Sequence, residues 1–266
     1  MDIDIPTGRD VLIYLSYTSK GDWLTIYEKL KNKEYYPSKE DVSKTLKKIK
    51  SKVITILDPE YPSYLRQIYH PPFVLYYYGD ISLISDFTKA IAVVGSRDCS
   101  SYGVSATRDI VRDIAKDFVI VSGMAKGIDS IAHQTTINNG GKTVAVMCTG
   151  IEKCYPAEVI DLYMEIKKNH LLLSEYPSST VPEKRDIPFR NRLIAAMSCI
   201  TIVGEAKMRS GTSITVGFAL DMGRDVLCIP YPIGTNSLCN RLIQFGAGLV
   251  ESGNDVYEEV RLQKFY

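Results

Sequence analysis

Short apolar runs recur along the chain from Ala90 onward, and a longer segment of helical pattern follows each of them. The runs read AIAVVG, FVIVSG, KTVAVMC, HLLLSE, CITIVGE and DVLCIP. Because neither face of such a run is polar, each suits a strand of a parallel sheet that helices cover on both sides. The pattern predicts an α/β fold with a doubly wound, mostly parallel sheet over residues 89–266.

Helical patterns dominate before this region. The segments DVLIYLSY, DWLTIYEKL and SKEDVSKTLKKIKSK predict a small helical module over residues 1–52, with Ser38 as the N-cap of the last helix. Val42, Leu46 and Ile49 recur there at helical spacing, so the lysines of this helix are interpreted as a solvated face, with phosphate contact as the alternative. These lysines are Lys44, Lys47, Lys48, Lys50 and Lys52.

Residues 53–88 separate the two regions. A β-branched run and a second, aromatic run flank four prolines there, which predicts a connector with one or two edge strands. The second run holds Tyr76, Tyr77 and Tyr78. We interpret these tyrosines as packing at the junction of the two regions, with base stacking as the alternative.

Composition and charge limit the kinds of protein that this chain can be. With 266 residues and 45% hydrophobic content, the chain can bury a substantial core. Its net charge of +1 means that any affinity for nucleic acid must come from a local patch. The start of the chain lacks a leader pattern and no segment is apolar enough to span a membrane, so we expect a cytoplasmic protein. Six cysteines without a C-x-x-C pair, and only three histidines, predict reduced thiols and neither metal nor cofactor.

Glycines and cations gather in the loops that follow four of the predicted strands. In a doubly wound sheet such loops meet at one edge, where ligands bind. Glycines let backbone N–H groups approach an anion closely, and helix N-termini favour negative charge. We therefore predict a site for several phosphates, the alternative being tight turns with surface ion pairs. The candidate residues are Gly95, Ser96, Arg97, Gly123, Lys126, Gly127, Arg190, Asn191, Arg192, Lys207, Arg209 and Gly211.

Known catalytic and nucleotide motifs are absent. The loop after the first strand lacks the G-x-G-x-x-G of a dinucleotide site, and no G-x-S-x-G is present. The GGKT at 140–143 resembles the end of a P-loop, but Thr136 stands where its first glycine is required and a strand follows, so we predict a helix-to-strand turn. Asp129 and His133 lie four residues apart on a predicted helix, where a structural contact is favoured over catalysis.

Seven segments, taken together, carry a resemblance to a known family. They read GSRDCSSYG, VSGMAKGIDSIAH, GGKTVAVMCTGIEKCYP, LLLSEYP, PFRNRLIAAMS, EAKMRSGTSIT and GRDVLCIP. In this order, between Val53 and Val250, they resemble the DNA-processing protein A (DprA, or Smf) family. The resemblance implies an extended Rossmann-like fold and a non-enzymatic, cytoplasmic protein. Such a protein binds and protects incoming single-stranded DNA in natural transformation, forms a homodimer and loads the recombinase RecA. It also implies that Arg97 clamps the DNA backbone.

The chain departs from the family pattern at two places. Relatives often carry a basic residue where this chain has Ala157, which removes one expected phosphate contact. Many relatives also append a winged-helix domain, whereas this chain stops at Tyr266. The N-terminal helices are similar to the family's sterile-alpha-motif-like domain, although their sequence is generic.

A short apolar helix near the C-terminus is the predicted dimer interface. Leu238, Leu242 and Ile243, with Phe245 nearby, offer more apolar surface than one domain edge needs to bury. The resemblance also points to this region for self-association, and the alternative is that these side chains pack only within their own chain.

Two other functions compete with DNA binding. A nucleotide-cleaving phosphoribohydrolase also follows its first strand with a Gly-Ser loop, but its P-G-G-x-G-T-x-x-E stretch is absent, and MRSGTSIT at the corresponding place lacks the glutamate. A protein adaptor would use the basic loops to bind an acidic partner. The salt dependence of DNA binding separates the adaptor from a DNA-binding protein, because each phosphate contact steepens it.

Overall fold

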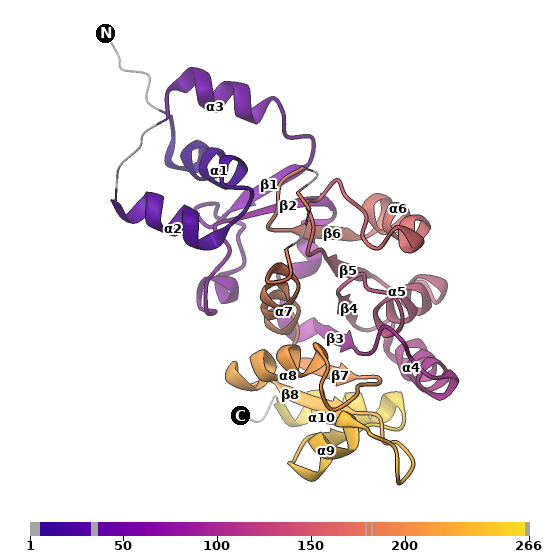
Figure 1. The fold of residues 1–266 in the computed structure, drawn as a ribbon. Coiled ribbons are helices and arrows are strands. Elements are labelled where there is room, and N and C mark those ends of the chain that lie inside the picture. Colours follow the sequence, from indigo (N-terminus) through magenta and orange to yellow (C-terminus); the bar gives the residue numbers. More distant parts are fainter. Residues whose placement is uncertain (1–5, 33–36, 179, 182, 264–266) are drawn as a thin grey trace.

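The computed structural model describes residues 6–32, 37–178, 180–181 and 183–263 (Figure 1). These residues form one nine-stranded sheet in the order β1-β2-β6-β5-β4-β3-β7-β8-β9. Neighbouring strands from β6 to β9 are parallel, while β2 is antiparallel to both β1 and β6. The strands are β1 (Lys52–Thr55), β2 (Val74–Gly79), β3 (Ala90–Val94), β4 (Val119–Ser122), β5 (Thr143–Val146), β6 (Leu171–Ser174), β7 (Ile200–Val203), β8 (Asp225–Cys228) and β9 (Gly248–Leu249).

The predicted doubly wound α/β fold is confirmed. All six apolar runs form parallel strands, β3 to β8. The connector was predicted to hold one or two edge strands: β1 lies at the edge, whereas β2 pairs on both sides, with β1 and β6. The pattern missed β9, because a strand of two residues is too short to show a period. From β3 the chain winds outward through β4, β5 and β6, and then returns to pair β7 with the other side of β3. Ligands of such sheets bind where the winding reverses, between the ends of β3 and β7.

Side chains along the buried strands point alternately to the two faces of the sheet, and each face carries a hydrophobic core. Ala90, Ala92 and Val94 point to one face and Ile91 and Val93 to the other. The first face packs against α7 (Asp186–Ala196), α8 (Thr212–Asp221) and α9 (Leu238–Gln244). The second packs against α4 (Ser101–Ile114), α5 (Ile128–Asn138), α6 (Ile160–Asn169) and α10 (Gly253–Gln263), as Figure 1 shows.

The helical module comprises α1 (Gly8–Thr18), α2 (Trp23–Asn32) and α3 (Lys39–Leu46). Ser38 caps α3 as predicted, accepting a hydrogen bond from Asp41 N at 3.1 Å. The module shares a hydrophobic cluster with the sheet, because Leu12 and Ile13 of α1 pack with Tyr76 of β2. Tyr76 is fully buried and its hydroxyl donates to Ser16 Oγ at 3.0 Å, so this tyrosine packs the junction as predicted. The division at residues 52 and 88 stays a prediction.

The GGKT segment forms the predicted turn between α5 and β5. Gly140 adopts φ +75°, which favours glycine, and β5 begins at Thr143. The Thr143 hydroxyl lies 2.6 Å from Nδ1 of the fully buried His133. His133 is therefore a core histidine, which agrees with the structural reading of its pattern.

Candidate functional site

Two neighbouring hollows lie at the carboxyl ends of the strands, the first where the winding reverses between β3 and β7 and the second at the ends of β4 and β5. The first, which we call the glycine pocket, has a volume of 430 Å³ and is lined by Gly95, Ser96, Arg97, Arg190, Asn191 and Gly211, among others. The second, the methionine pocket, has a volume of 540 Å³ and is lined by Gly123, Met124, Lys126, Met147 and Tyr155, among others. Arg97, Ala125 and Arg190 line both, so the two pockets form one continuous cleft. The fold thus brings together most of the predicted site residues.

Arg97 is the exposed cation at the boundary of the two pockets. Among the described residues, none forms an ion pair or hydrogen bond with its guanidinium, which leaves its donors free for a ligand. Lys126 is also exposed, on the methionine pocket, and pairs with Glu158. An ion pair between two exposed side chains contributes little, so a phosphate can replace Glu158 at low cost.

Arg190 is buried in the wall between the pockets. Its Nε donates to Asn191 Oδ1 at 3.1 Å, and Nη1 donates to the carbonyl oxygen of Val146. Burial raises the pKa of the nearby Asp129 carboxyl, while the positive charge of Arg190 acts in the opposite direction. Arg190 therefore supplies positive charge to both pockets from within the protein, with part of its hydrogen bonding already used.

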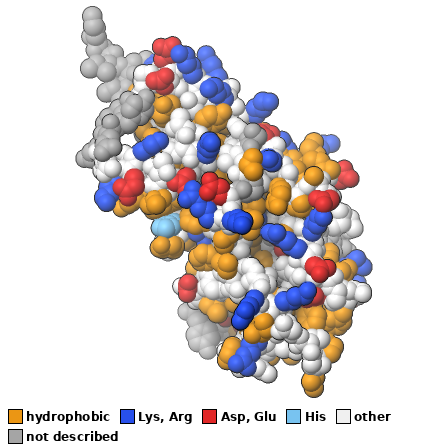
Figure 2. Space-filling model, in the orientation of Figure 1, with side chains coloured by type: hydrophobic (Ala, Val, Ile, Leu, Met, Phe, Trp, Pro, Cys, Tyr) orange, Lys and Arg blue, Asp and Glu red, His pale blue; other side chains and the backbone are white. Residues whose placement is uncertain are grey.

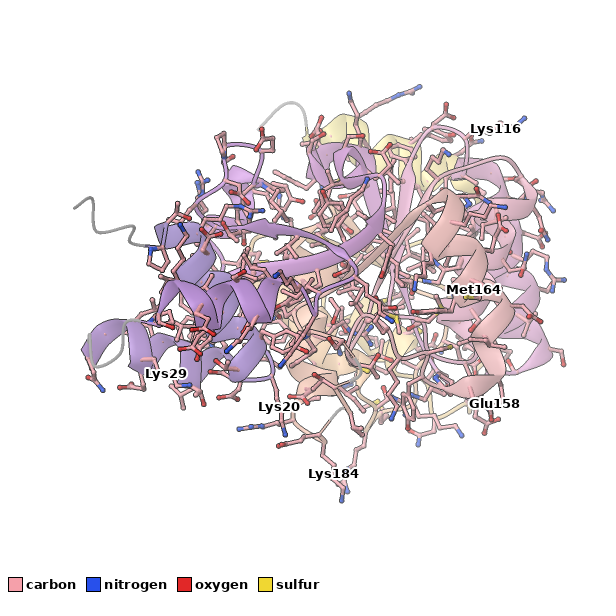
Figure 3. All side chains as sticks on the ribbon, turned by 90° about the horizontal axis from the view of Figure 1, so that it is seen from above. Lys20, Lys29, Lys116, Glu158, Met164 and Lys184 are labelled. Atoms are coloured by element: carbon pink, nitrogen blue, oxygen red, sulfur yellow. The ribbon has the colours of Figure 1, made fainter. Side chains whose placement is uncertain are left out.

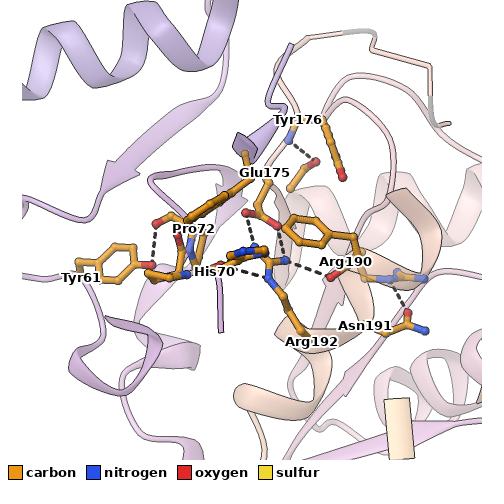
Figure 4. Close-up of polar contacts among 12 residues, drawn as sticks. Tyr61, His70, Pro72, Glu175, Tyr176, Arg190, Asn191 and Arg192 are labelled. Atoms are coloured by element: carbon orange, nitrogen blue, oxygen red, sulfur yellow. Dashed lines mark hydrogen bonds and ion pairs between the residues drawn. The ribbon is translucent and has the colours of Figure 1, made fainter. Parts of the chain in front are cut away.

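The structure corrects the prediction for Arg192. This side chain is 0% exposed and makes a paired contact with Glu175, from Nη1 to Oε2 at 2.6 Å and from Nη2 to Oε1 at 2.7 Å (Figure 4). Its Nε and Nη2 also donate to the carbonyl oxygen of His70, at 3.1 and 2.9 Å, and its guanidinium stacks on Phe189. Since these donors are used inside the protein, Arg192 joins α7 to the connector and does not face the cleft.

Three of the predicted glycines are required by the protein's own packing. A Cβ on Gly123 would lie 2.6 Å from both Arg190 Nη1 and Asp129 Oδ2. A Cβ on Gly95 would lie 2.6 Å from Ile128, and one on Gly127, at φ +78°, would lie 2.2 Å from the carbonyl oxygen of Ser96. Of the predicted glycines, Gly211 alone has open space where a Cβ would stand, so the packing of the protein does not require glycine there.

Lys207 and Arg209 flank the cleft without lining it. Both are exposed in the loop after β7, and Lys207 Nζ lies 3.9 Å from Asp98 of the β3 loop. Arg209 lies two residues before Gly211, which lines the glycine pocket. These cations can therefore extend the positive rim of the cleft on the β7 side.

The phosphate position of a dinucleotide fold is filled by Glu205. In that fold the pyrophosphate binds the N-terminus of the helix after the first strand, which is α4 here. Glu205 Oε2 accepts hydrogen bonds there from Ser100 N and Ser100 Oγ, at 2.9 and 2.8 Å, and from the Tyr231 hydroxyl at 3.0 Å. The α4 N-terminus already holds this internal carboxylate, so a ligand must bind beside it, in the cleft.

Sequence reasoning missed Glu205 and the apolar wall of the methionine pocket. Glu205 lies 105 residues from Ser100, and no local pattern signals such a pairing. The wall comes from Met124, Met147 and the segment around Tyr155, whose ring is exposed. Ala157 also lines this pocket, which places the departure from the family pattern directly at the site.

The predicted dimer residues divide into buried and exposed ones. Leu238 is buried in its own chain, and Leu242 and Ile243 are half-buried against the same core cluster. Leu238 is thus corrected to a core residue, as the internal alternative proposed. Phe245 is 72% exposed, with the Arg241 guanidinium 4.4 Å from its ring centre.

Metal-ligating clusters and membrane-spanning helices are absent from the described residues. No group of three or more His, Cys, Asp or Glu side chains is placed to hold a metal ion in this part of the chain. No helix within the same residues has the length and apolar character that crossing a membrane requires.

Comparison with known proteins gives consistent matches. The family model for DNA recombination-mediator protein A matches residues 52–261. DNA processing protein DprA of Streptococcus pneumoniae strain R6 is 46% identical over 220 residues, covering 82% of this chain and 77% of that protein. The protein of the same name from Bacillus subtilis is 37% identical over 238 residues, covering 87% and 79%.

Two solved structures resemble the fold closely. The X-ray structure of DprA from Streptococcus pneumoniae superposes with a TM-score of 0.79 at 38% identity, covering 95% of this chain and 93% of that one. DNA processing protein A from Helicobacter pylori, which has a single-stranded DNA binding mode, superposes with a TM-score of 0.72 at 27% identity, covering 82% and 98%.

Proposed function

This chain belongs to the DNA recombination-mediator protein A family, and on that premise we propose that it binds the backbone of single-stranded DNA in the cleft of the glycine and methionine pockets. The observation that carries the proposal is Arg97, an exposed guanidinium shared by both pockets and without a carboxylate partner among the described residues. Lys126 and the buried Arg190 add positive charge on either side of it. The Helicobacter pylori relative supports the choice of ligand.

The chemistry of the cleft favours backbone contact over sequence readout. Arginine and lysine bind phosphates irrespective of the base, so affinity should vary little among mixed sequences. The exposed ring of Tyr155 offers a surface on which a base can lie. Duplex DNA should bind more weakly, because a stiff helix cannot bend its phosphates into a cleft at a sheet edge.

We propose that the cleft binds without catalysis. The glutamate of the phosphoribohydrolase stretch P-G-G-x-G-T-x-x-E is lacking in the corresponding MRSGTSIT, and the acid that precedes this segment, Glu205, is engaged by Ser100 and Tyr231 and lines neither pocket. Asp129 is buried beside Arg190 and Glu158 pairs with Lys126, so these two carboxylates do not form an acid–base pair. Incubation with nucleoside monophosphates should release no free base.

The broader role is also a proposal. The family resemblance supports protection of incoming DNA during natural transformation, loading of RecA and a homodimer. The exposed Phe245 beside α9 is the remaining apolar candidate for the dimer interface, since Leu238 is internal. Sedimentation of the protein as a monomer at high concentration would contradict the dimer.

A binding titration tests the central function. Fluorescence anisotropy should show tighter binding of a labelled single strand than of the matching duplex. The log–log salt slope should be about −3 for four phosphate contacts, at about −0.7 for each contact. A flat salt response, or equal affinity for both forms, would contradict the proposal and favour a protein adaptor.

A further inference from the structure

A second, polar groove lies between the helical module and the residues that follow β6. It has a volume of 760 Å³ and is bounded by the α1–α2 turn, the end of α3 and residues 176–178, 180–181 and 183–186. We call it the module groove; Lys20, Asp22, Lys48, Ser178 and Arg185 are among its lining residues. The hydroxyl groups of Ser19 and Thr45 also line it, while those of Thr18 and Thr180 donate to the carbonyl oxygens of Tyr14 and Pro177, at 2.9 and 2.7 Å. This lining suits a charged, hydrogen-bonding ligand better than an apolar one.

The turn at residues 150–153 lies between the cleft and the module groove. A hollow of 400 Å³ shares Lys48 and Ser178 with it and is also lined by Ile151 and Glu152. The next residue, Lys153, lines the methionine pocket and closes a turn by donating from its N to the Gly150 carbonyl oxygen at 2.9 Å. A chain that leaves the methionine pocket can therefore cross this turn into the module groove.

Lysine side chains without an ion-pair partner among the described residues line the same route. Lys20, Lys48 and Lys50 are exposed and Lys153 is half-buried, and none of them pairs with a carboxylate among the described residues. The acids along the route are largely held by other cations. Glu152 pairs with Lys167 at 2.9 Å, and Arg185 lies 3.1 Å from Asp22 and 3.0 Å from Glu183.

Asp186 is the remaining acid in the groove wall. Burial raises the pKa of its carboxyl, and its Oδ2 accepts a hydrogen bond from Glu183 N at 2.6 Å. The groove lining thus holds three cations and three acids, and its cations without an ion pair among the described residues are Lys20 and Lys48.

The cations of the groove and the cleft face the same side of the molecule. Figure 3 shows Lys20, Lys184 and Glu158 projecting along one side. Glu158 pairs with Lys126, which places the end of Lys126 on this side as well. In Figure 2, lysine and arginine side chains gather over the region between the helical module and the sheet. One flexible strand can reach both sets of cations without passing around the protein.

We propose that a single strand longer than the cleft continues over the turn at 150–153 into the module groove, where Lys48 and Lys20 bind its phosphates. The proposal rests on the proposed function and extends it to the helical module. The proposal gives this role to Lys48 and not to the neighbouring lysines. Lys44 pairs with Glu40 at 2.7 Å, and Lys47 lines neither the groove nor the hollow. Single-strand sites characteristically track the backbone with such a charged groove.

The test compares two oligonucleotide lengths with matched variants. Anisotropy titrations use oligo-dT of about 6 and about 20 nucleotides, lengths that span the range of compact single-strand sites. Lys48→Glu should weaken the longer oligonucleotide about fivefold and make its salt slope shallower by about 0.7, the contribution of one contact. Binding of the shorter oligonucleotide should not change. Lys47→Glu, with the same change of charge on the neighbouring residue, should leave both affinities as in the parent.

Each outcome decides one of the two proposals. If Lys48→Glu and Lys47→Glu act equally on the longer oligonucleotide, or neither acts, the extension is wrong even when Arg97→Glu abolishes binding of the shorter one. If Arg97→Glu leaves the shorter one tightly bound, the proposed cleft is wrong. If the parent binds neither oligonucleotide, both proposals fall. Both lysines are exposed, so circular dichroism of the two variants should match the parent.

Discussion

The loop that carries Arg97 and the junction that holds Arg192 differ in how much of each guanidinium the protein itself uses. Arg97 is exposed and has no partner among the described residues, whereas Arg192 is fully buried between Glu175, Phe189 and the carbonyl oxygen of His70. Both arginines follow strands of one sheet, and both fit a phosphate site by sequence. The difference teaches that burial and partners, rather than position after a strand, decide which cation is available to a ligand.

The largest loss of stability is expected from a substitution at the junction that holds Arg192. Arg192→Ala leaves Glu175 buried without its partner, so the free energy of unfolding should fall by about 3–5 kcal/mol. Urea denaturation followed by circular dichroism measures this change. A loss below about 1 kcal/mol, the range of an exposed ion pair, would show that the contact is solvated and would weaken the comparison.

The internal carboxylate at α4 should have the next largest effect. Glu205→Ala leaves the Ser100 N–H and hydroxyl without this acceptor, while the Tyr231 hydroxyl keeps the carbonyl oxygen of Gly204 at 2.9 Å, so stability should fall by about 1.5 kcal/mol. Glu205→Gln retains an acceptor oxygen and should lose less. Equal losses for the two variants in the same urea assay would contradict the role given to the carboxylate.

A smaller effect should appear as a pH dependence of stability. Burial, with the nearby charges of His170 and Arg190, lowers the pKa of His133 to about 3. In the unfolded chain histidine titrates near 6.5, so below that pH the unfolded state binds a proton that the folded state excludes. The contribution of His133 is therefore complete above pH 6.5 and is lost as the pH falls, by about 1.4 kcal/mol between pH 7.5 and 5.5.

His133→Gln provides the control for this pH dependence. Glutamine does not titrate, so the loss of stability between the same two pH values should shrink in the variant. His70 and His170, whose pKa values are also lowered chiefly by burial, should account for part of the slope that remains. An unchanged slope in the variant would show that His133 is protonated in the folded protein.

Sequence reasoning predicted the fold better than the site. Strands β3 to β8 could be predicted because each is an apolar run bounded by a change of pattern. The turn at Gly140 could be predicted because its glycines precede a strand. Arg97 and Lys126 were predicted to lie at one edge because loops after parallel strands meet there, and both line the cleft. Arg192 was misread because the contacts that bury it come from Glu175 and His70, and the one from His70 spans 122 residues of sequence. Glu205 was missed for the same physical reason, since its partners are distant in the chain.

The comparison between the two arginines is tested most directly by the salt dependence of single-strand binding in Arg97→Glu. The matched control is Arg261→Glu, an exposed arginine in α10 that lines neither pocket of the cleft. Arg97→Glu should keep the stability of the parent within about 0.5 kcal/mol. It should bind single strands about tenfold more weakly, with a log–log salt slope shallower by about 0.7 or more, while the control matches the parent. If Arg97→Glu stays folded and binds with the affinity and salt slope of the parent, the cleft is not the phosphate-binding site.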